Sequence, residues 1–199
     1  MTWAKATYAQ GVERSTAAPS ERPGPERKNG RAPNSGFTMA HPDYPVTPAV
    51  RFLRDREIEF EPHLYQYQEH GGTRVAALEL GVSEHILVKT LVMETDQHKP
   101  LLVLMHGDRE VSTRQLARLL QVKSVTPCSE RAATRLTGYL IGGTSPFGTR
   151  TAMPVYVERS IFELPRMLIN GGKRGFLVEI DPLVLRGTLP VTEVDIAVA

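Results

Sequence analysis

The sequence contains one cysteine, Cys128, and no long apolar run. A single cysteine cannot form an internal disulfide, which fits a reducing compartment. No apolar stretch approaches the roughly eighteen residues that a membrane span requires, and the start of the chain lacks the uninterrupted apolar core of a signal peptide. We therefore expect a cytoplasmic protein that is not embedded in a membrane.

The sequence also lacks the usual signs of a catalytic centre. Its six histidines are scattered without metal-ligand spacing, and no two carboxylates stand out as a general acid and base. Cys128 lies between a proline and a helix-capping serine, where a small residue is simply convenient. We expect no metal and no cofactor, so a catalyst built this way must orient a reactive substrate and stabilise developing charge.

Charge is unevenly distributed along the chain. Of the 24 basic and 22 acidic residues, six basic and three acidic ones lie in residues 1–40, which leaves 18 and 19 in residues 41–199. The first segment has almost no large apolar residue, so we predict a disordered basic N-terminal extension over 1–40 and a domain over 41–199. The balance in the domain excludes a general DNA or RNA binder and allows only a local RNA contact. Met39 resembles an ordinary start, so residues 1–38 are either a basic tail or sequence upstream of the true start.

Short helical and strand-like segments follow one another irregularly after residue 46. Thr47-Pro48, Ser112 and Ser129 have the form of helix starts. Apolar or alternating runs predict strands at residues 57–67 (an edge strand with a bulge at Pro62), 86–93, 101–105, 122–126, 155–157, 167–169 and 176–180. Because regular βαβ alternation is absent, we predict an α+β fold: one compact domain with a mixed, mostly antiparallel sheet and short flanking helices.

A glycine-rich loop is the most informative stretch. Residues 136–148, LTGYLIGGTSPFG, contain the adjacent pair Gly142 and Gly143, with Ser145 and Pro146 beside it. Bulky residues alternate with the glycines, so we expect a loop that is anchored in the core and lets backbone N–H groups approach a ligand. A purely structural loop is the alternative.

A second glycine cluster, NGGKRG at residues 170–175, follows a strand-like run. Its backbone amides, together with Lys173 and Arg174, could grip an anionic group. A solvated hairpin tip is the plainer interpretation. Neither cluster has the spacing of a P-loop or a dinucleotide fingerprint, so we exclude both.

Lys89 lies inside the apolar run ILVKTLVM, residues 86–93. Apolar residues occupy both alternating faces of this strand, so the lysine side chain must point into a buried surface or a cleft. One interpretation is an edge lysine whose stem covers apolar surface while its ammonium reaches water. The other is a cation held for a phosphate or carbonyl oxygen, with the Thr90 hydroxyl next to it. The two glycine clusters favour the second.

These three motifs, taken in order, resemble one family. VKTL at residues 88–91, TGYLIGGTSPFG at 137–148 and GGKRG at 171–175 make residues 47–188 similar to the YbaK/EbsC family of aminoacyl-tRNA deacylases, which is related to the editing insertion domain of bacterial prolyl-tRNA synthetases. The resemblance implies a compact α+β domain with a mixed, partly barrel-like sheet. It also implies hydrolysis of cysteine from tRNA(Pro), in trans beside prolyl-tRNA synthetase and without a metal.

The resemblance also assigns site residues. It implies that Lys89 is the essential catalytic lysine. The substrate-binding residues that we predict are Tyr65, Thr90, Gly142, Gly143, Ser145, Pro146, Asn170, Gly171, Gly172, Lys173 and Arg174. The chain departs from its relatives in two places, because Asn170 stands where they often have serine and Leu177 stands where some have an acid. These departures bear on which amino acid is removed.

Three functional hypotheses follow. The first is a deacylase for cysteine on tRNA(Pro), with aminoacyl-tRNA as substrate and prolyl-tRNA synthetase as a candidate partner; either water or the substrate's own group attacks the ester. The second keeps the reaction but removes alanine or serine. The third is a module that binds tRNA or a synthetase without catalysis. A synthetase rejects a similarly small wrong amino acid by only about 10–200-fold per methylene, which is why a second hydrolytic step is needed.

Overall fold

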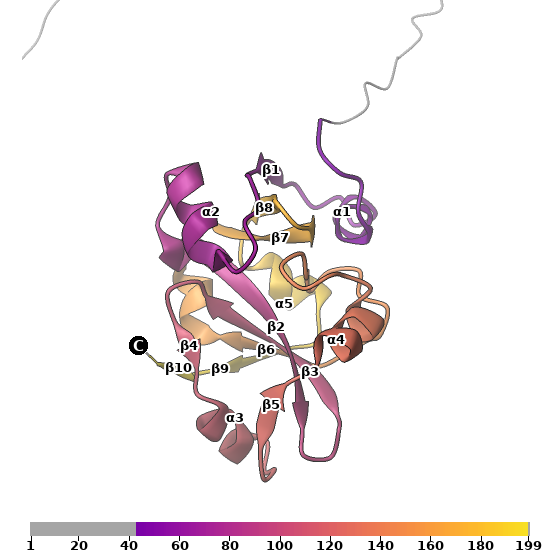
Figure 1. The fold of residues 1–199 in the computed structure, drawn as a ribbon, viewed down its shortest axis with the longest axis vertical. Helices are drawn as coiled ribbons and strands as arrows, with labels where there is room; N and C mark the ends of the chain where they lie inside the picture. Colours follow the sequence, from indigo (N-terminus) through magenta and orange to yellow (C-terminus); the bar gives the residue numbers. More distant parts are fainter. Residues whose placement is uncertain (1–42, 199) are drawn as a thin grey trace, which may run out of the picture. The chain divides into compact units, whose positions relative to one another are not determined.

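The computed structural model describes residues 43–198 (Figure 1). The extension predicted for residues 1–40 lies outside this range. Among the described residues, no helix has the length and hydropathy needed to cross a bilayer.

An eight-stranded sheet carries the fold. Seven strands follow the order β1-β8-β7-β2-β3-β6-β9, and β5 also pairs with β2. A small second sheet joins β4 to β10. Five of the eight pairings are antiparallel and three are parallel, which confirms the predicted α+β fold with a mixed, mostly antiparallel sheet. The strands are β1 (Glu61–Leu64), β2 (Leu87–Thr95), β3 (Pro100–His106), β4 (Glu110–Val111), β5 (Val125–Pro127), β6 (Val155–Glu158), β7 (Met167–Lys173), β8 (Phe176–Ile180), β9 (Val191–Val194) and β10 (Ala197–Val198).

The helices begin where the capping residues predict. The side chains of Thr47, Ser112 and Ser129 accept backbone N–H groups at the starts of α1, α3 and α4, which satisfies donors that a helix leaves unpaired. Gly81 ends α2 in the left-handed conformation (φ 68°). The helices are α1 (Pro48–Arg54), α2 (Gly72–Leu80), α3 (Thr113–Leu119), α4 (Glu130–Thr137) and α5 (Val184–Thr188), with 3₁₀ turns at η1 (Glu84–Ile86) and η2 (Arg159–Glu163).

The core divides into three apolar clusters. The largest packs α1, α4 and α5 on one side of the sheet, around the buried ring of Phe147. A second packs Leu116 of α3 against Met93 and Val125. A third packs α2 against the start of β2 and against β7 and β8, through Leu87. Leu87 and Met93 lie on the same face of β2 but in different clusters, so the middle of this face lies between two cores.

Three strand predictions need correction. The segment predicted as a strand over 57–67 is a strand only at β1, and the predicted bulge at Pro62 is wrong, because Pro62 pairs regularly with Val178. Pro62 is accommodated because β1 is an edge strand, where a missing backbone N–H can face away from the sheet. The irregular pairing lies instead between Asn170 and Lys173 in the β7–β8 hairpin. Strands β4, β9 and β10 were not predicted.

Candidate active site

A cleft of about 740 Å³ lies along the middle of β2. It is bordered by the segment that leads into α2, by the start of α4 and by the part of the glycine-rich loop that follows α4. This volume falls within the range of sites that enclose a small organic ligand. Six of the predicted site residues line it: Tyr65, Lys89, Thr90, Gly142, Asn170 and Arg174.

The cleft exists because one edge of β2 is open. Strand β3 pairs with β2 over its whole middle, from Val88 to Glu94. On the other edge, β7 pairs only with Leu87 and Val88, and β5 pairs only from Met93 onward. Residues 89–92 therefore have no partner strand on that edge.

The backbone of Thr90 faces the open edge. The carbonyl of Val92 accepts the N–H of Cys128 (2.9 Å), so the peptide groups of Val92 point away from β3. Residues two apart on a strand share this orientation, so the N–H and C=O of Thr90 point the same way. Neither β5 nor β7 has a residue in register with Thr90. The cleft thus receives a backbone donor and acceptor from the centre of the sheet.

Lys89 and Thr90 reach the cleft from opposite faces of the sheet. Consecutive strand residues point to opposite sides. Lys89 lies on the face between the clusters of Leu87 and Met93, whereas Thr90 shares its face with Val88 of the largest cluster. Both can line one cleft only because the cleft wraps around the open edge. The prediction that the Thr90 hydroxyl lies next to the lysine is therefore wrong in detail, although both residues line the same cleft.

Lys89 has an acidic neighbour, which the sequence interpretation lacked. Its Nζ lies 3.4 Å from Oε1 of Glu110 on β4, and the two side chains are 22% and 76% exposed. Ion pairs with such an exposed partner are worth about 0–1 kcal/mol, so the carboxylate orients the ammonium and can be displaced from it by a substrate oxygen.

Besides its backbone groups, Thr90 has a side-chain hydroxyl that lacks a hydrogen-bond partner among the described residues. Its Oγ1 is buried. Leaving a buried hydroxyl unsatisfied costs about 1–3 kcal/mol. A ligand atom in the cleft would remove this cost.

The glycine loop forms the opposite wall of the cleft. Gly142 has φ 84°, and a Cβ at this position would lie 2.9 Å from the Tyr67 ring. The position therefore requires glycine both for its backbone conformation and for the approach of the ring. Gly143 packs against the β7–β8 turn, because a Cβ there would lie 2.8 Å from the backbone N of Arg174.

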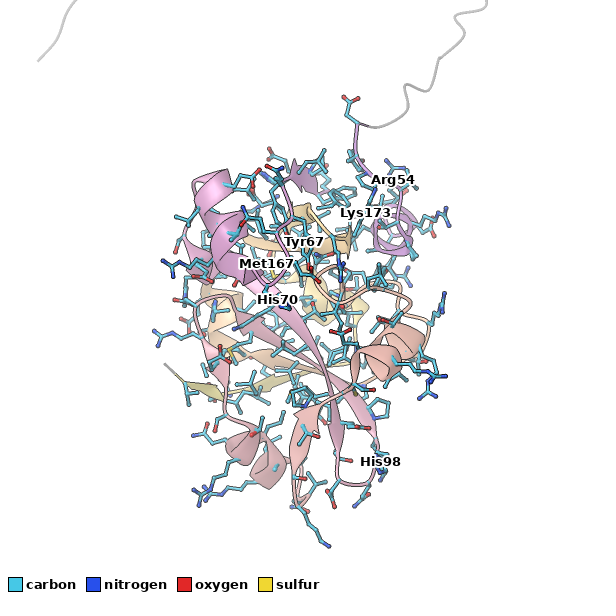
Figure 2. The ribbon with its side chains drawn as sticks, in the orientation of Figure 1. Arg54, Tyr67, His70, His98, Met167 and Lys173 are labelled. Atoms are coloured by element: carbon cyan, nitrogen blue, oxygen red, sulfur yellow. The ribbon has the colours of Figure 1, made fainter. Side chains whose placement is uncertain are left out.

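Two side chains of the β7–β8 hairpin hold this loop. Asn170 donates from Nδ2 to the carbonyl of Gly142 (3.1 Å), and Arg174 donates from Nε to the carbonyl of Ile141 (2.8 Å). The guanidinium of Arg174 also lies over the ring of Tyr67, 5.0 Å from its centroid. Figure 2 shows Tyr67 near this hairpin. The two glycine clusters predicted from the sequence therefore meet and build one wall.

The second glycine cluster does not grip an anion through the amides of Gly172 and Lys173. Asn170 Oδ1 already accepts the N–H groups of Gly172 (2.8 Å) and Lys173 (3.2 Å). That expectation is corrected, because an asparagine at the start of a tight turn bonds the backbone that follows it.

Six of the predicted binding residues do not line the cleft: Gly143, Ser145, Pro146, Gly171, Gly172 and Lys173. The Ser145 side chain is buried, and its Oγ accepts the N–H of Phe147 at 3.4 Å. Gly171 packs on the ring of Phe176, and Gly172 packs on the ring of Tyr139. Ser145 and the three glycines therefore support the wall from behind, and the predicted contacts of these six residues with a substrate stay predictions.

Burial keeps two groups of the cleft neutral. It raises the pKa of the Tyr65 phenol, so this hydroxyl acts as a hydrogen-bonding group. Burial, with a smaller contribution from the Glu94 carboxylate, also raises the pKa of the Cys128 thiol. Cys128 lines the cleft, but a raised pKa disfavours the thiolate that a nucleophile needs.

The sequence interpretation missed Tyr67 and Glu110, which both line the cleft. Tyr67 follows Tyr65 by two residues in a segment of alternating burial, a spacing that could have indicated a shared face. No pattern in the sequence around Glu110 indicated a place in the cleft, because this residue approaches Lys89 only in the folded chain.

One group among residues 43–198 could hold a metal ion: Glu61, His63 and Glu179, whose ligand atoms lie within 4.8 Å of one another. Arg166 already pairs with Glu179 (3.3 Å). None of the three lines the cleft, so this group has no part in its chemistry.

Comparisons with known proteins give consistent results. A model of the family described as "Aminoacyl-tRNA editing domain" matches residues 72–187. A protein of Enterococcus faecalis named as a Cys-tRNA(Pro)/Cys-tRNA(Cys) deacylase, EbsC, is 26% identical over 137 residues, which cover 68% of this chain and 84% of the relative. A proline–tRNA ligase of Thermodesulfovibrio yellowstonii is 32% identical over 115 residues, which cover 58% of this chain but only 18% of the ligase.

Solved structures share the fold. One described as a trans-editing enzyme for prolyl-tRNA synthetase superposes with a TM-score of 0.67 at 21% identity, covering 78% of this chain and 100% of the other. The hypothetical protein APE2540 gives 0.70 at 22% identity, covering 76% and 100%.

Proposed function

The chain belongs to the family of aminoacyl-tRNA editing domains, and on this premise we propose that it is an aminoacyl-tRNA deacylase that removes cysteine from tRNA(Pro) in trans, beside prolyl-tRNA synthetase and in the cytoplasm. The observation that carries the proposal is the open edge of β2, where the Lys89 ammonium and the peptide groups of Thr90 meet in one cleft. EbsC, which is named for this activity, supports the substrate.

The arrangement suits the hydrolysis of an already activated ester. Lys89 binds the ester carbonyl oxygen or the 3′-terminal phosphate, and the ammonium stabilises the negative charge that develops in the transition state. The attacking atom is either a water oxygen or a nucleophile that the substrate carries. It bonds to the carbonyl carbon, the bond to the ribose oxygen breaks, and the proton of the attacking group passes to that oxygen. Orientation of the two reactants supplies the rest.

The lining of the cleft favours cysteine over serine. On the face that carries Lys89, the cleft is lined by Ala76, Leu87, Leu168 and Leu177, which belong to the apolar cluster beneath α2. A serine hydroxyl buried there without a partner would be penalised, whereas a thiol behaves as a small apolar group. We expect weaker discrimination between cysteine and alanine, because the presence or absence of one small group changes the selectivity of a site by only about 10–200-fold.

A panel of charged tRNAs tests the proposal. The purified chain is incubated with tRNA(Pro) carrying Cys, Ala, Ser or Pro, and the loss of the aminoacyl ester is followed over time. We expect cysteine to be released fastest and proline to be spared. Faster release of alanine or serine would change the substrate within the same reaction. No turnover of any charged tRNA, combined with retained tRNA binding, would favour a non-catalytic module.

A further inference from the structure

A second hollow, of about 490 Å³, lies between α3 and the segment before β5. Its rim carries Arg114, Arg118 and Lys123, which are all exposed. Arg114 and Arg118 are four residues apart on α3, so their guanidinium groups project from the same face of the helix. Like charges at this spacing repel each other, and an anion between them would relieve that repulsion.

These three cations differ from three arginines near the two ends of the sheet. Arg159, Arg166 and Arg186 each lie within 4.0 Å of an acidic side chain. Among the described residues, no carboxylate lies that close to the charged groups of the three rim residues. Asp96 is near, but its carboxylate accepts the backbone N–H of Lys123 (3.1 Å) and fixes the turn rather than the ammonium. In a domain whose basic and acidic residues balance, this hollow is a local positive site.

The hollow adjoins the cleft through one short strand. Ser124 and Val125 line the hollow, and Pro127 and Cys128 line the cleft, so Thr126 alone separates the two along β5. Even if fully extended, the chain from Lys123 to Cys128 spans at most roughly 17 Å. A stacked nucleic-acid strand places a phosphate every 3.4 Å or so, so four or five nucleotides bridge this distance. Strand β5 pairs only with β2, which leaves its other edge uncovered by a strand.

We propose that the hollow bounded by Arg114, Arg118 and Lys123 binds phosphates of the tRNA acceptor arm while its 3′ end occupies the cleft. The proposal rests on the proposed function, because tRNA is the ligand. The three cations neutralise phosphates several nucleotides upstream of the aminoacyl ester, and the strand follows β5 between the two sites. The contact is to the backbone, so it is independent of sequence.

Binding of an uncharged tRNA(Pro) transcript to the full chain tests this directly. The variant Arg114→Gln/Arg118→Gln/Lys123→Gln is compared with the parent by fluorescence anisotropy over a series of salt concentrations. We expect the affinity at about 0.1 M salt to fall about tenfold or more. The magnitude of the negative slope of log K against log salt should become smaller by roughly two, because each lost phosphate contact removes about 0.7–0.9 from that magnitude.

Two controls keep the result specific. Arg51→Gln/Arg54→Gln removes cations from α1, at the opposite end of the domain from α3; Figure 2 labels Arg54 there and His98 at the end near β5. This control should keep the parental salt slope. Hydrolysis of 3′-cysteinyl-adenosine, which is too short to reach the hollow, should be equal in the triple variant and the parent, whereas KM for the charged tRNA should rise.

Several outcomes would overturn the proposal. The first is an unchanged tRNA affinity in the triple variant, as expected if the hollow binds an acidic protein segment instead. The second is a loss of affinity with an unchanged salt slope. The third is a loss of activity on cysteinyl-adenosine as large as the loss on charged tRNA. Failure of the proposed function looks different. In that case no charged tRNA is hydrolysed by the parent, yet the triple variant still binds tRNA more weakly.

Discussion

The two walls of the cleft are held in place by different means. The strand wall, with Lys89 and Thr90, is fixed by continuous backbone pairing between β2 and β3. The loop wall, with Gly142, is fixed by side-chain hydrogen bonds from Asn170 and Arg174. Backbone pairing does not depend on which side chain a residue carries, so the strand wall can change its chemistry without losing its position. The loop wall cannot, because its shape depends on individual residues.

The largest expected effect comes from the strand wall. Lys89→Met keeps most of the stem's packing and removes the charge, so kcat/KM for the charged tRNA should fall by about 10²–10³, as when an enzyme loses one charge-stabilising donor. Thermal stability should hardly change, because the Glu110 carboxylate is exposed and water can solvate it once its partner is gone. Single-turnover deacylation and a melting curve measure the two effects.

Glu110→Gln separates the ion pair from the ammonium itself. It breaks the pair but leaves Lys89 charged, so its effect on deacylation should remain below tenfold. An effect as large as that of Lys89→Met would mean that the carboxylate takes part in the reaction.

The loop wall should respond in shape and stability together. Gly142→Ala places a Cβ 2.9 Å from the Tyr67 ring at φ 84°, so we expect a loss of about 1–3 kcal/mol from backbone strain and an additional decrease in activity as Tyr67 moves. Denaturant unfolding and kcat/KM measure these. Gly81→Ala is the matched control, because φ is 68° there and nothing lies within 4 Å. Equal activity losses in both variants would remove the argument for the Tyr67 contact.

The smallest effect is expected at Cys128. Cys128→Ala should leave kcat/KM within about twofold of the parent, because burial keeps the thiol protonated and a protonated thiol is a poor nucleophile. Parallel deacylation assays of this variant and of Lys89→Met distinguish charge stabilisation by Lys89 from nucleophilic attack by the Cys128 thiol. An inactive alanine variant beside an active Lys89→Met would place the chemistry on the thiol.

Local signals explain what the sequence predicted correctly. The capping side chains of Thr47, Ser112 and Ser129 act within three residues, so the helix starts could be predicted from neighbouring sequence. The position of Lys89 in a cleft was also predictable, because an ammonium in an apolar strand must reach water or a partner. The glycines at 142 and 143 and the bulky residues around them indicated an anchored loop, and the structure shows that Tyr67 and the backbone of Arg174 pack against the two glycines. The predicted approach of a ligand to this loop stays a prediction.

The predictions that failed depend on distant contacts. Strand β9 pairs in parallel with β6, 36 residues earlier, and no local pattern encodes such a pairing. Glu110 meets Lys89 because β2 pairs with β3, which places His106, four residues before Glu110, opposite Val88. The hydrogen bond from Asn170 to the carbonyl of Gly142, 28 residues earlier, was not predicted either, and the predicted contact of Asn170 with the substrate stays a prediction.

The open edge of β2 also bears on self-association. Unpaired strand edges recruit strands from other chains, and proteins normally cover or shorten them. Here the stretch that lacks a partner strand, residues 89–92, is about 13 Å long and is bounded at both ends by β7 and β5. Its Val92 carbonyl already accepts the N–H of Cys128. A foreign strand of ordinary length cannot dock against so short a gap, whereas the end of a nucleic acid or a small ester can enter it. The domain can therefore offer backbone hydrogen bonds to a ligand without offering a template for aggregation.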